Sequence, residues 1–419
     1  MAMIEIAVKF IKTRFFLSLT ILLQVCVLLS AVDSLRNSKL LVDAGKDILN
    51  GRSPYSTPNP YGTWPGTLYA LLDYLSFSSL TLYLVIGLNL CGFALLAKYL
   101  VPNSKLQLVL ILSLLTSPVR ALISNVQNTG IILGSLIVGI HLLGRFQSSR
   151  KQAYIHLSAF FFLFAFELKP QLALPLIVLV ILQRRVLLLL ISFVFQMIFI
   201  RILLDLWIGE ILELEQIRIW KIMRTDPLAV KEQISPWKVL GHFLPNGVDW
   251  FVISFFFTIL LILVVALLGL RSQSRNLEVI ALALPLTSGY LHYYDLLVLL
   301  IFIIAMNLRP EKYLFTGATF SIIFLALPTH LGSHVVLNEI LLIVFINIFL
   351  AIYVASDFRS IMFRLVESGI ALAMTSIISS AFDSLELALS CMLTIVFILQ
   401  SKSVVNFLRR NWTQFRTSA

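Results

Sequence analysis

The sequence predicts an all-α integral membrane protein that crosses the bilayer many times. Of the 419 residues, 59% are hydrophobic and only 13% are charged. Long apolar stretches alternate with short polar ones, and basic residues gather in every second connection. This composition is typical of polytopic membrane proteins and leaves no polar stretch long enough for a separate soluble domain. The net charge of +11 fits cytoplasmic loops beside anionic lipid head groups, and we expect no nucleic-acid partner.

The apolar stretches give the expected number of membrane helices. A spanning helix needs about 20 residues, which predicts about 12–14 transmembrane helices. The predicted spans are 10–31, 79–100, 106–123, 129–144, 153–167, 170–183, 186–208, 249–270, 277–291, 295–308, 312–330, 335–355, 365–381 and 384–400. Residues 68–77 are either a further interfacial helix or the start of the second span. Residues 301–419 contribute C-terminal helices and a cytoplasmic tail.

The distribution of basic residues orients the chain. Lys and Arg are enriched in cytoplasmic loops, which places the N-terminus in the cytoplasm. The apolar stretch after Arg14 is long for a signal peptide, so we expect an uncleaved first helix. The opposite, exterior face then collects the unusual polar segments. These are the loops 33–65 and 209–248, Arg120 with Gln127 and Asn128, residues 167–170, residues 292–295, and His330 with His334.

The first exterior loop begins with an amphipathic segment. Apolar residues between Val32 and Leu49 recur mostly three or four apart, which predicts a short helix lying at the membrane interface. Gly51 and the prolines that follow end this helix and predict an irregular loop. Lys46 and Asp47 are expected on its solvated face.

Four stretches resemble one family in order and approximate spacing. They are the first exterior loop from Asp43 to Tyr55 with Trp64-Pro65, the run 125–128, the turn Leu168-Lys169-Pro170, and the run 288–294. Together they resemble bacterial GT-C glycosyltransferases, most closely the mannosyltransferase-like branch that uses polyprenyl-phosphate sugars. The resemblance covers residues 1–300. Where that family has its acid, this chain has Asn37, and Asp33 stands one helical turn earlier.

The resemblance implies an inverting transferase of the plasma (inner) membrane whose site faces the exterior or periplasm. A carboxylate would remove the proton of an acceptor hydroxyl on a glycolipid or cell-envelope glycan, and the sugar, most plausibly mannose, would leave a polyprenyl phosphate. The base would be Asp33 or, as the alternative, Asp43. Substrate-binding residues would be Tyr55, Arg120, Gln127, Asn128, Lys169, His292 and Tyr293. Neither a metal nor another cofactor is expected.

Three of these residues also have an ordinary structural interpretation. Asp33 could cap the first helix, Lys169 could pair with Glu167 at the interface, and His292 could belong to an aromatic belt. Likewise, the 209–248 loop either covers the lipid donor or admits the acceptor, or it is a solvated loop that rests on the membrane.

Other polar residues within the apolar stretches have simpler interpretations. His330 and His334 are four apart, but they lack a third metal ligand nearby. Cys26, Cys91 and Cys391 are expected as packing residues. Arg201 and Asp205 are expected to pair within the seventh span.

Three other functions fit a protein of this composition. A flippase or transporter of lipid-linked sugars would need charged residues well inside its spans. A polysaccharide polymerase or ligase would transfer whole oligosaccharides. A non-catalytic scaffold would use none of the predicted site residues. Most charged residues lie at predicted helix ends, which favours the transferase over the transporter.

Overall fold

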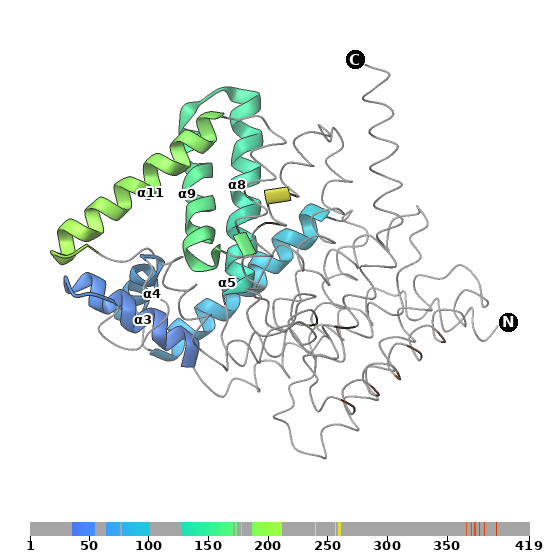
Figure 1. Ribbon diagram of the computed structural model, residues 1–419, viewed down its shortest axis with the longest axis horizontal. Helices are drawn as coiled ribbons and strands as arrows, with labels where there is room; N and C mark the ends of the chain where they lie inside the picture. Colours follow the sequence, from blue (N-terminus) through green and yellow to red (C-terminus); the bar gives the residue numbers. More distant parts are fainter. Residues whose placement is uncertain are drawn as a thin grey trace.

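The described part of the protein is a set of packed α-helices. The computed structural model describes residues 36–54, 64–75, 78–100, 128–170, 172–173, 177 and 187–211, together with single helical positions farther along the chain. The helices are α3 (Arg36–Leu49), α4 (Pro65–Leu75), α5 (Ser78–Leu100), α8 (Thr129–Ser149), α9 (Gln152–Leu168) and α11 (Leu187–Ile208) (Figure 1). No strand occurs within these ranges. The prediction of an all-helical chain is therefore confirmed for this part.

Helices α8 and α9 form an antiparallel hairpin at the centre of the described part. Arg150 ends α8 in the left-handed conformation, with φ 57°, and its backbone N–H donates to the carbonyl oxygen of Phe146. Farther along, the helices meet where Phe162 covers Gly139, because a side chain at Gly139 would lie 2.5 Å from the Phe162 ring. The Ser158 hydroxyl donates to the Gly139 carbonyl oxygen at 2.7 Å. Phe162 is completely buried, so this crossing anchors the hairpin core.

Helix α5 packs against α8 through glycines. A side chain at Gly92 would collide with the backbone of Gly130 and would lie 3.2 Å from the Gly134 nitrogen. A side chain at Gly134 would lie 2.8 Å from the Gly92 Cα atom. Small residues that let two backbones approach in this way are a common device for packing membrane helices.

Helices α3 and α4 form a second unit. Gly51 has φ 67° and ends α3, with the Gly51 N–H donating to Ile48 and the Arg52 N–H to Asp47. These two bonds complete a Schellman motif, which favours glycine at this position. The helices cross where Gly45 meets Gly66, because a side chain at Gly45 would collide with the Gly66 carbonyl.

The predicted amphipathic helix is confirmed, and its apolar face packs against other parts of the protein. Leu41, Val42, Ala44 and Ile48 are all buried within the protein, and α4 is the described helix packed most closely against α3. Protein therefore covers this face of α3, and the placement of the helix at a membrane interface stays a prediction. Residues 65–75 also form a helix separate from α5, so this stretch is not the start of the second span.

Helix α11 leaves most of its surface uncovered. Only Leu189, Ser192 and Phe193 are buried, whereas large apolar side chains from Leu187 to Trp207 are exposed. Two described helices, α8 and α11, are long and apolar enough to cross a membrane, and α9 is a shorter apolar helix. The predicted spans 79–100, 129–144, 153–167 and 186–208 coincide with α5, α8, α9 and α11.

Two of the three cysteines lie in the described part of the chain, and neither is fully buried there. Cys91 lies on α5 and is exposed, and Cys391 is partly exposed. The predicted spans 10–31 and 106–123, and the helices expected after residue 211, lie outside the continuously described ranges.

Candidate functional site

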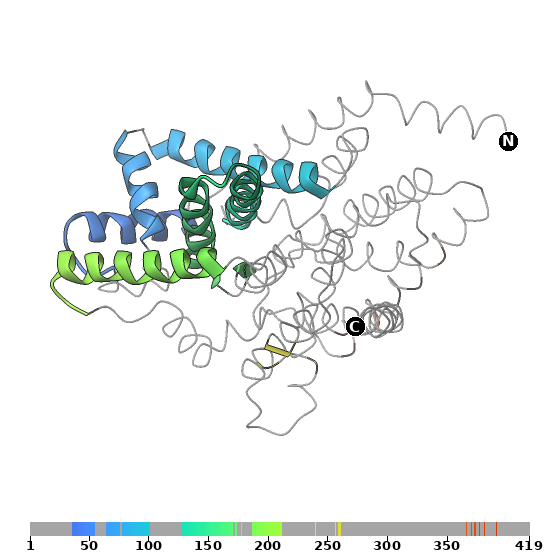
Figure 2. The same cartoon turned by 90° about the horizontal axis from the view of Figure 1, so that it is seen from above.

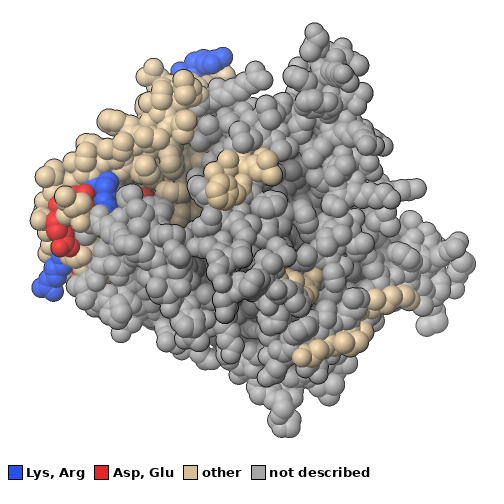
Figure 3. All heavy atoms as spheres, viewed as in Figure 1, with Lys and Arg blue, Asp and Glu red and all other residues tan. Residues whose placement is uncertain are grey.

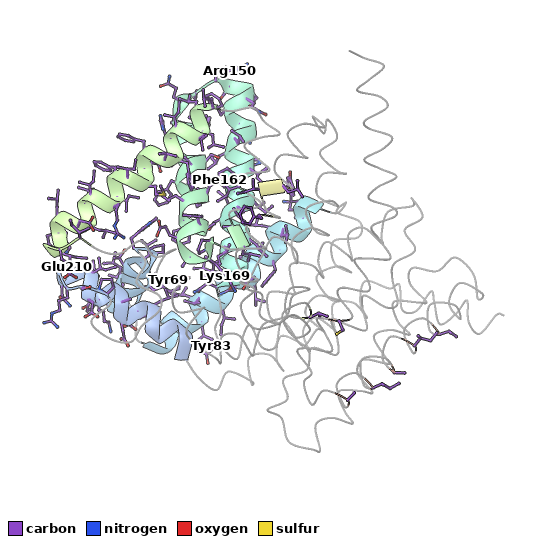
Figure 4. The ribbon with its side chains drawn as sticks, viewed as in Figure 1. Tyr69, Tyr83, Arg150, Phe162, Lys169 and Glu210 are labelled. Atoms are coloured by element: carbon purple, nitrogen blue, oxygen red, sulfur yellow. The ribbon has the colours of Figure 1, made fainter. Side chains whose placement is uncertain are left out.

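The described candidate site residues lie at one end of the α8–α9 hairpin. Because the two helices are antiparallel, Asn128 at the start of α8 and Lys169 after α9 share an end, and Arg150 marks the opposite end (Figure 4). Helices α3 and α4 lie at the Lys169 end, and α11 descends to the same region (Figure 1). In Figure 2, α8 and α9 are seen nearly end-on, α3 and α4 lie beside them, and α5 and α11 extend across the view.

Asn128 is fixed by a residue that the sequence did not single out. Its side chain does not cap α8. Instead, its Oδ1 accepts a hydrogen bond of 2.9 Å from the hydroxyl of Tyr69 on α4. Tyr69 is only 4% exposed, and burial raises the pKa of its phenol above the ordinary value. The phenol therefore keeps its proton and remains a donor, which ties α4 to the start of α8.

Asn89 of α5 takes over the capping of α8. Its buried Oδ1 accepts hydrogen bonds from the backbone N–H groups of Gly130, at 2.9 Å, and Ile131, at 3.3 Å. Its Nδ2 donates to the Val85 carbonyl oxygen at 2.9 Å. The first N–H groups of a helix lack partners within the helix, so Asn89 satisfies two donors that would otherwise be unpaired in the core.

Lys169 lies at the predicted break after α9. Its backbone is extended, with φ −158° and ψ 82°, as expected for a residue before proline. The chain becomes helical again at Pro170, and the Lys169 carbonyl oxygen accepts hydrogen bonds from Leu172 and Ala173. The side chain is partly exposed at the same hairpin end as Asn128, where a cation could bind an anionic group.

The charged residues of α3 correct one expectation. Lys46 does not simply face solvent, because its Nζ lies 2.7 Å from Asp73 Oδ2 of α4 and 5.6 Å from the centre of the Tyr74 ring. The hydrogen bond with Asp73 raises the Lys46 pKa, so the ammonium group stays charged. Asp43 is partly exposed on the same helix, one turn before Asp47.

Helix α11 is joined to α3 by a tryptophan. The Trp207 indole N–H donates to the Ile48 carbonyl oxygen at 2.7 Å, which satisfies a carbonyl at the end of α3. The predicted pair on α11 is confirmed, with Arg201 Nε 3.3 Å from Asp205 Oδ1.

Aromatic rings join α4 to α9. The Trp64 ring lies 5.6 Å from Phe160 and 5.7 Å from Phe164, measured between ring centres. Trp64 Nε1 and Arg201 Nη2 are buried donors without an acceptor among the described residues. An oxygen atom of a bound molecule could satisfy either donor.

A further polar cluster joins the N-terminal halves of α9 and α11. His156 Nδ1 lies 2.8 Å from Ser192 Oγ, and the Gln196 amide donates to Ser192 Oγ at 3.1 Å and to the His156 carbonyl oxygen at 3.0 Å. This cluster lies toward the Arg150 end and so lies apart from Asn128 and Lys169.

The remaining candidates lie outside the described residues. They are Asp33, Tyr55, Arg120, Gln127, His292, Tyr293, His330 and His334. Within the described ranges, no group of three potential metal ligands occurs.

The most important contacts of this end were missed by the sequence interpretation. Asn89 is a single amide in an apolar run, and Tyr69 and Asp73 lie in a stretch that reads as apolar. Their partners are 41, 59 and 27 residues away in the chain. The only signal was a polar group inside an apolar helix, which must find a partner when it is buried.

Comparison with known proteins identifies no family for this chain. No family model, curated protein or solved structure matches this chain.

Proposed function

We propose that this protein is a polytopic membrane protein whose helices α5, α8, α9 and α11 cross the bilayer, with the Arg150 end of the α8–α9 hairpin in the cytoplasm. Support comes from the length and apolar surface of α8 and α11. In Figure 3, charged side chains of the described residues gather at the turn between α8 and α9 and around α3, with a mostly uncharged surface between. A band of that kind matches a hydrocarbon layer bounded by two polar interfaces.

Within this membrane, the protein acts as a glycosyltransferase of GT-C type. The observation that carries this proposal is the gathering of three family-like stretches at one hairpin end. The α3 segment, Asn128 and the Lys169-Pro170 turn are far apart in the sequence, yet they share that end. A shared end is what a single exterior site built from these stretches requires.

The proposed reaction moves one sugar from a polyprenyl-phosphate carrier to a glycolipid or glycan. The carboxylate of Asp33, or of Asp43 as the alternative, takes the proton of the acceptor hydroxyl. The oxygen then bonds to the anomeric carbon while the bond from that carbon to the phosphate oxygen breaks. Lys169 stabilises the negative charge that grows on the leaving phosphate. The lipid tail of the donor lies in the bilayer beside the helices.

Transfer by purified protein in lipid tests the proposal. Labelled polyprenyl-phosphate mannose is supplied with native membrane glycolipids, and wild type is compared with Asp33→Asn, Asp43→Asn and Lys169→Met. We expect wild type to transfer label and one of the two Asp variants to lose nearly all transfer. Lys169→Met should lower the turnover rate more than it changes donor binding, because its charge acts on the leaving group.

The same preparation separates the rivals. A flippase would move labelled donor across sealed vesicles without making a glycosylated product. A polymerase or ligase would give products that grow by whole oligosaccharides. If a panel of carrier-linked sugars gives no product at all, the transferase proposal is wrong.

A further inference from the structure

We propose that Tyr69 is a positioning residue for the substrate site at the Lys169 end of the hairpin. It holds the side-chain amide of Asn128 so that Nδ2 donates a hydrogen bond to an oxygen of the carrier-linked sugar phosphate. This inference rests on the proposed function. It adds the atom through which Asn128 binds and the residue that orients it, and Tyr69 belongs to a stretch that reads as apolar in the sequence.

The first observation is a division of roles between two asparagines. Asn128 stands directly before α8, at the position where an asparagine side chain usually caps a helix. Its side chain makes no such bond. The Gly130 and Ile131 N–H groups are bonded instead to the buried Oδ1 of Asn89. The start of α8 is therefore capped from α5, which leaves the Asn128 side chain available for another contact.

The second observation is the direction of the Asn128 amide. The Tyr69 hydroxyl donates to Asn128 Oδ1 at 2.9 Å. The oxygen and the nitrogen of a carboxamide lie on opposite sides of the group, so Nδ2 points away from Tyr69. The reverse orientation would leave the buried phenol proton without an acceptor among the described residues. Burial raises the pKa of this phenol, so the proton stays in place and the amide keeps its direction.

The third observation is that the directed group is accessible. Asn128 is partly exposed, whereas Tyr69 is buried. Within the described part of the chain, Nδ2 has no acceptor. An amide nitrogen carries two N–H donors and accepts no hydrogen bond, so it selects an oxygen with a free lone pair. In a sugar phosphate, such oxygens belong to the hydroxyl groups and to the phosphate.

The fourth observation is the position of Lys169. Tyr69 and Lys169 both lie at the end of the hairpin opposite Arg150 (Figure 4). Packed helices have axes about 8–10 Å apart, so one ligand of the size of a sugar phosphate can contact both the start of α8 and the end of α9. Lys169 supplies charge, which attracts a phosphate from any direction. A neutral donor with a fixed direction instead selects where one oxygen of the ligand must lie.

Equilibrium binding of labelled polyprenyl-phosphate mannose to the purified protein in lipid nanodiscs tests this inference. Wild type, Tyr69→Phe, Asn128→Asp and the double variant form a double-mutant cycle. Tyr69→Phe removes the hydroxyl, whereas Asn128→Asp keeps the accepting oxygen and loses the Nδ2 donor. Asn50→Asp is the matched control, because it adds the same charge at the exposed end of α3. Binding is measured well below the melting temperature of every variant.

We expect Asn128→Asp to weaken binding at least about tenfold, because it removes a donor and adds repulsion against the phosphate. Tyr69→Phe should weaken binding about two- to fivefold, since the amide is no longer held in one direction. The double variant should bind as weakly as Asn128→Asp and no more weakly, because Tyr69 acts through the amide. In transfer assays, Tyr69→Phe should raise KM for the donor and leave kcat nearly unchanged. Asn50→Asp should bind as wild type does.

The carrier without its sugar identifies the oxygen that accepts the bond. If Asn128→Asp also weakens binding of sugar-free polyprenyl phosphate, Nδ2 donates to a phosphate oxygen. If only the mannose-bearing carrier binds more weakly, Nδ2 donates to a sugar hydroxyl. Both results uphold the role of Asn128.

Two results would overturn the inference and leave the proposed function standing. One is equal binding by Asn128→Asp and wild type. The other is additive losses in the double variant, because Tyr69 would then act on the fold and not through the amide. If wild type binds no carrier-linked sugar of the panel, the proposed function fails and this inference fails with it. Should Asn128→Asp fail to fold, Asn128→Ala takes its place in the cycle.

Discussion

At the scale of single residues, the hydroxyl of Tyr69 is the link between α4 and the start of α8. Tyr69→Phe removes the donor and leaves Asn128 Oδ1 without this partner. We expect a loss of about 0.5–1.5 kcal/mol in the free energy of unfolding, the net contribution of one hydrogen bond, because Asn128 is partly exposed and water can replace the lost donor. Thermal unfolding of the purified protein measures the loss. Tyr83→Phe is the control, since Tyr83 is exposed on α5.

The raised pKa of Tyr69 also predicts a dependence of stability on pH. An unfolded tyrosine loses its proton at a pKa of about 10, whereas the buried phenol keeps it to higher pH. Its contribution to stability is therefore present below the unfolded pKa and is lost as the pH rises above it. We expect the melting temperature of wild type to fall more steeply above about pH 10 than that of Tyr69→Phe. Parallel curves for the two proteins would contradict this account.

Asn89 provides the strongest single-residue test of the site scaffold. Asn89→Leu keeps the branched shape of the side chain but leaves the Gly130 and Ile131 N–H groups without their acceptor. At about 1–3 kcal/mol for each unsatisfied group, this change should destabilise the protein severely. Asn89→Asp should destabilise less than Asn89→Leu, because a carboxylate keeps the acceptor for these two bonds, but it loses the Nδ2 donor to the Val85 carbonyl oxygen and so should not match wild type. Equal losses in both variants would show that the amide is not a cap.

At the scale of elements, two glycines of α5 make a matched pair. A Cβ atom at Gly92 would collide with Gly130 of α8, whereas a Cβ atom at Gly87 would meet nothing within 4 Å. Gly87→Ala should leave stability unchanged or raise it by up to about 1 kcal/mol, through helix propensity alone. Gly92→Ala should push α5 away from α8 and lower the melting temperature strongly. Equal melting temperatures for the two variants would show that the crossing is not close.

The elements also show which parts of the fold could be predicted from the sequence. Apolar length was enough to place α5, α8, α9 and α11, and Pro170 was enough to end α9. The pairing of α3 with α4 could not be predicted in this way, because it depends on Gly45 meeting Gly66 at a distance of 21 positions. An amphipathic pattern identifies an apolar face, but it does not tell lipid from another helix as the partner of that face.

The candidate site residues could likewise be predicted from local sequence, whereas their contacts with other helices could not. Lys169 was identified because a lysine before proline marks a helix end within a single short stretch. The partners of Asn128 and of the α8 N-terminus lie on other helices, so only the tertiary structure could reveal them. The sequence does show polar groups within apolar runs, and such groups need hydrogen-bond partners when they are buried. It does not show which residues those partners are.

At the scale of the whole molecule, the arrangement of charged ends predicts which parts face each side of the membrane. The turn near Gln152 lies at one hairpin end and the exposed Asn50 after α3 lies at the other. If α8 and α9 span the bilayer, the two positions must face opposite sides. In a background without native cysteines, Asn50→Cys should react with a membrane-impermeant maleimide added outside intact cells. Gln152→Cys should react only after the membrane is permeabilised, because basic turns are retained in the cytoplasm.

The reverse pattern would invert the orientation, and the proposed exterior site would then face the cytoplasm. Reaction of both positions from the same side would mean that the hairpin does not cross the membrane, and the apolar surface of α11 would then need a protein partner instead of lipid.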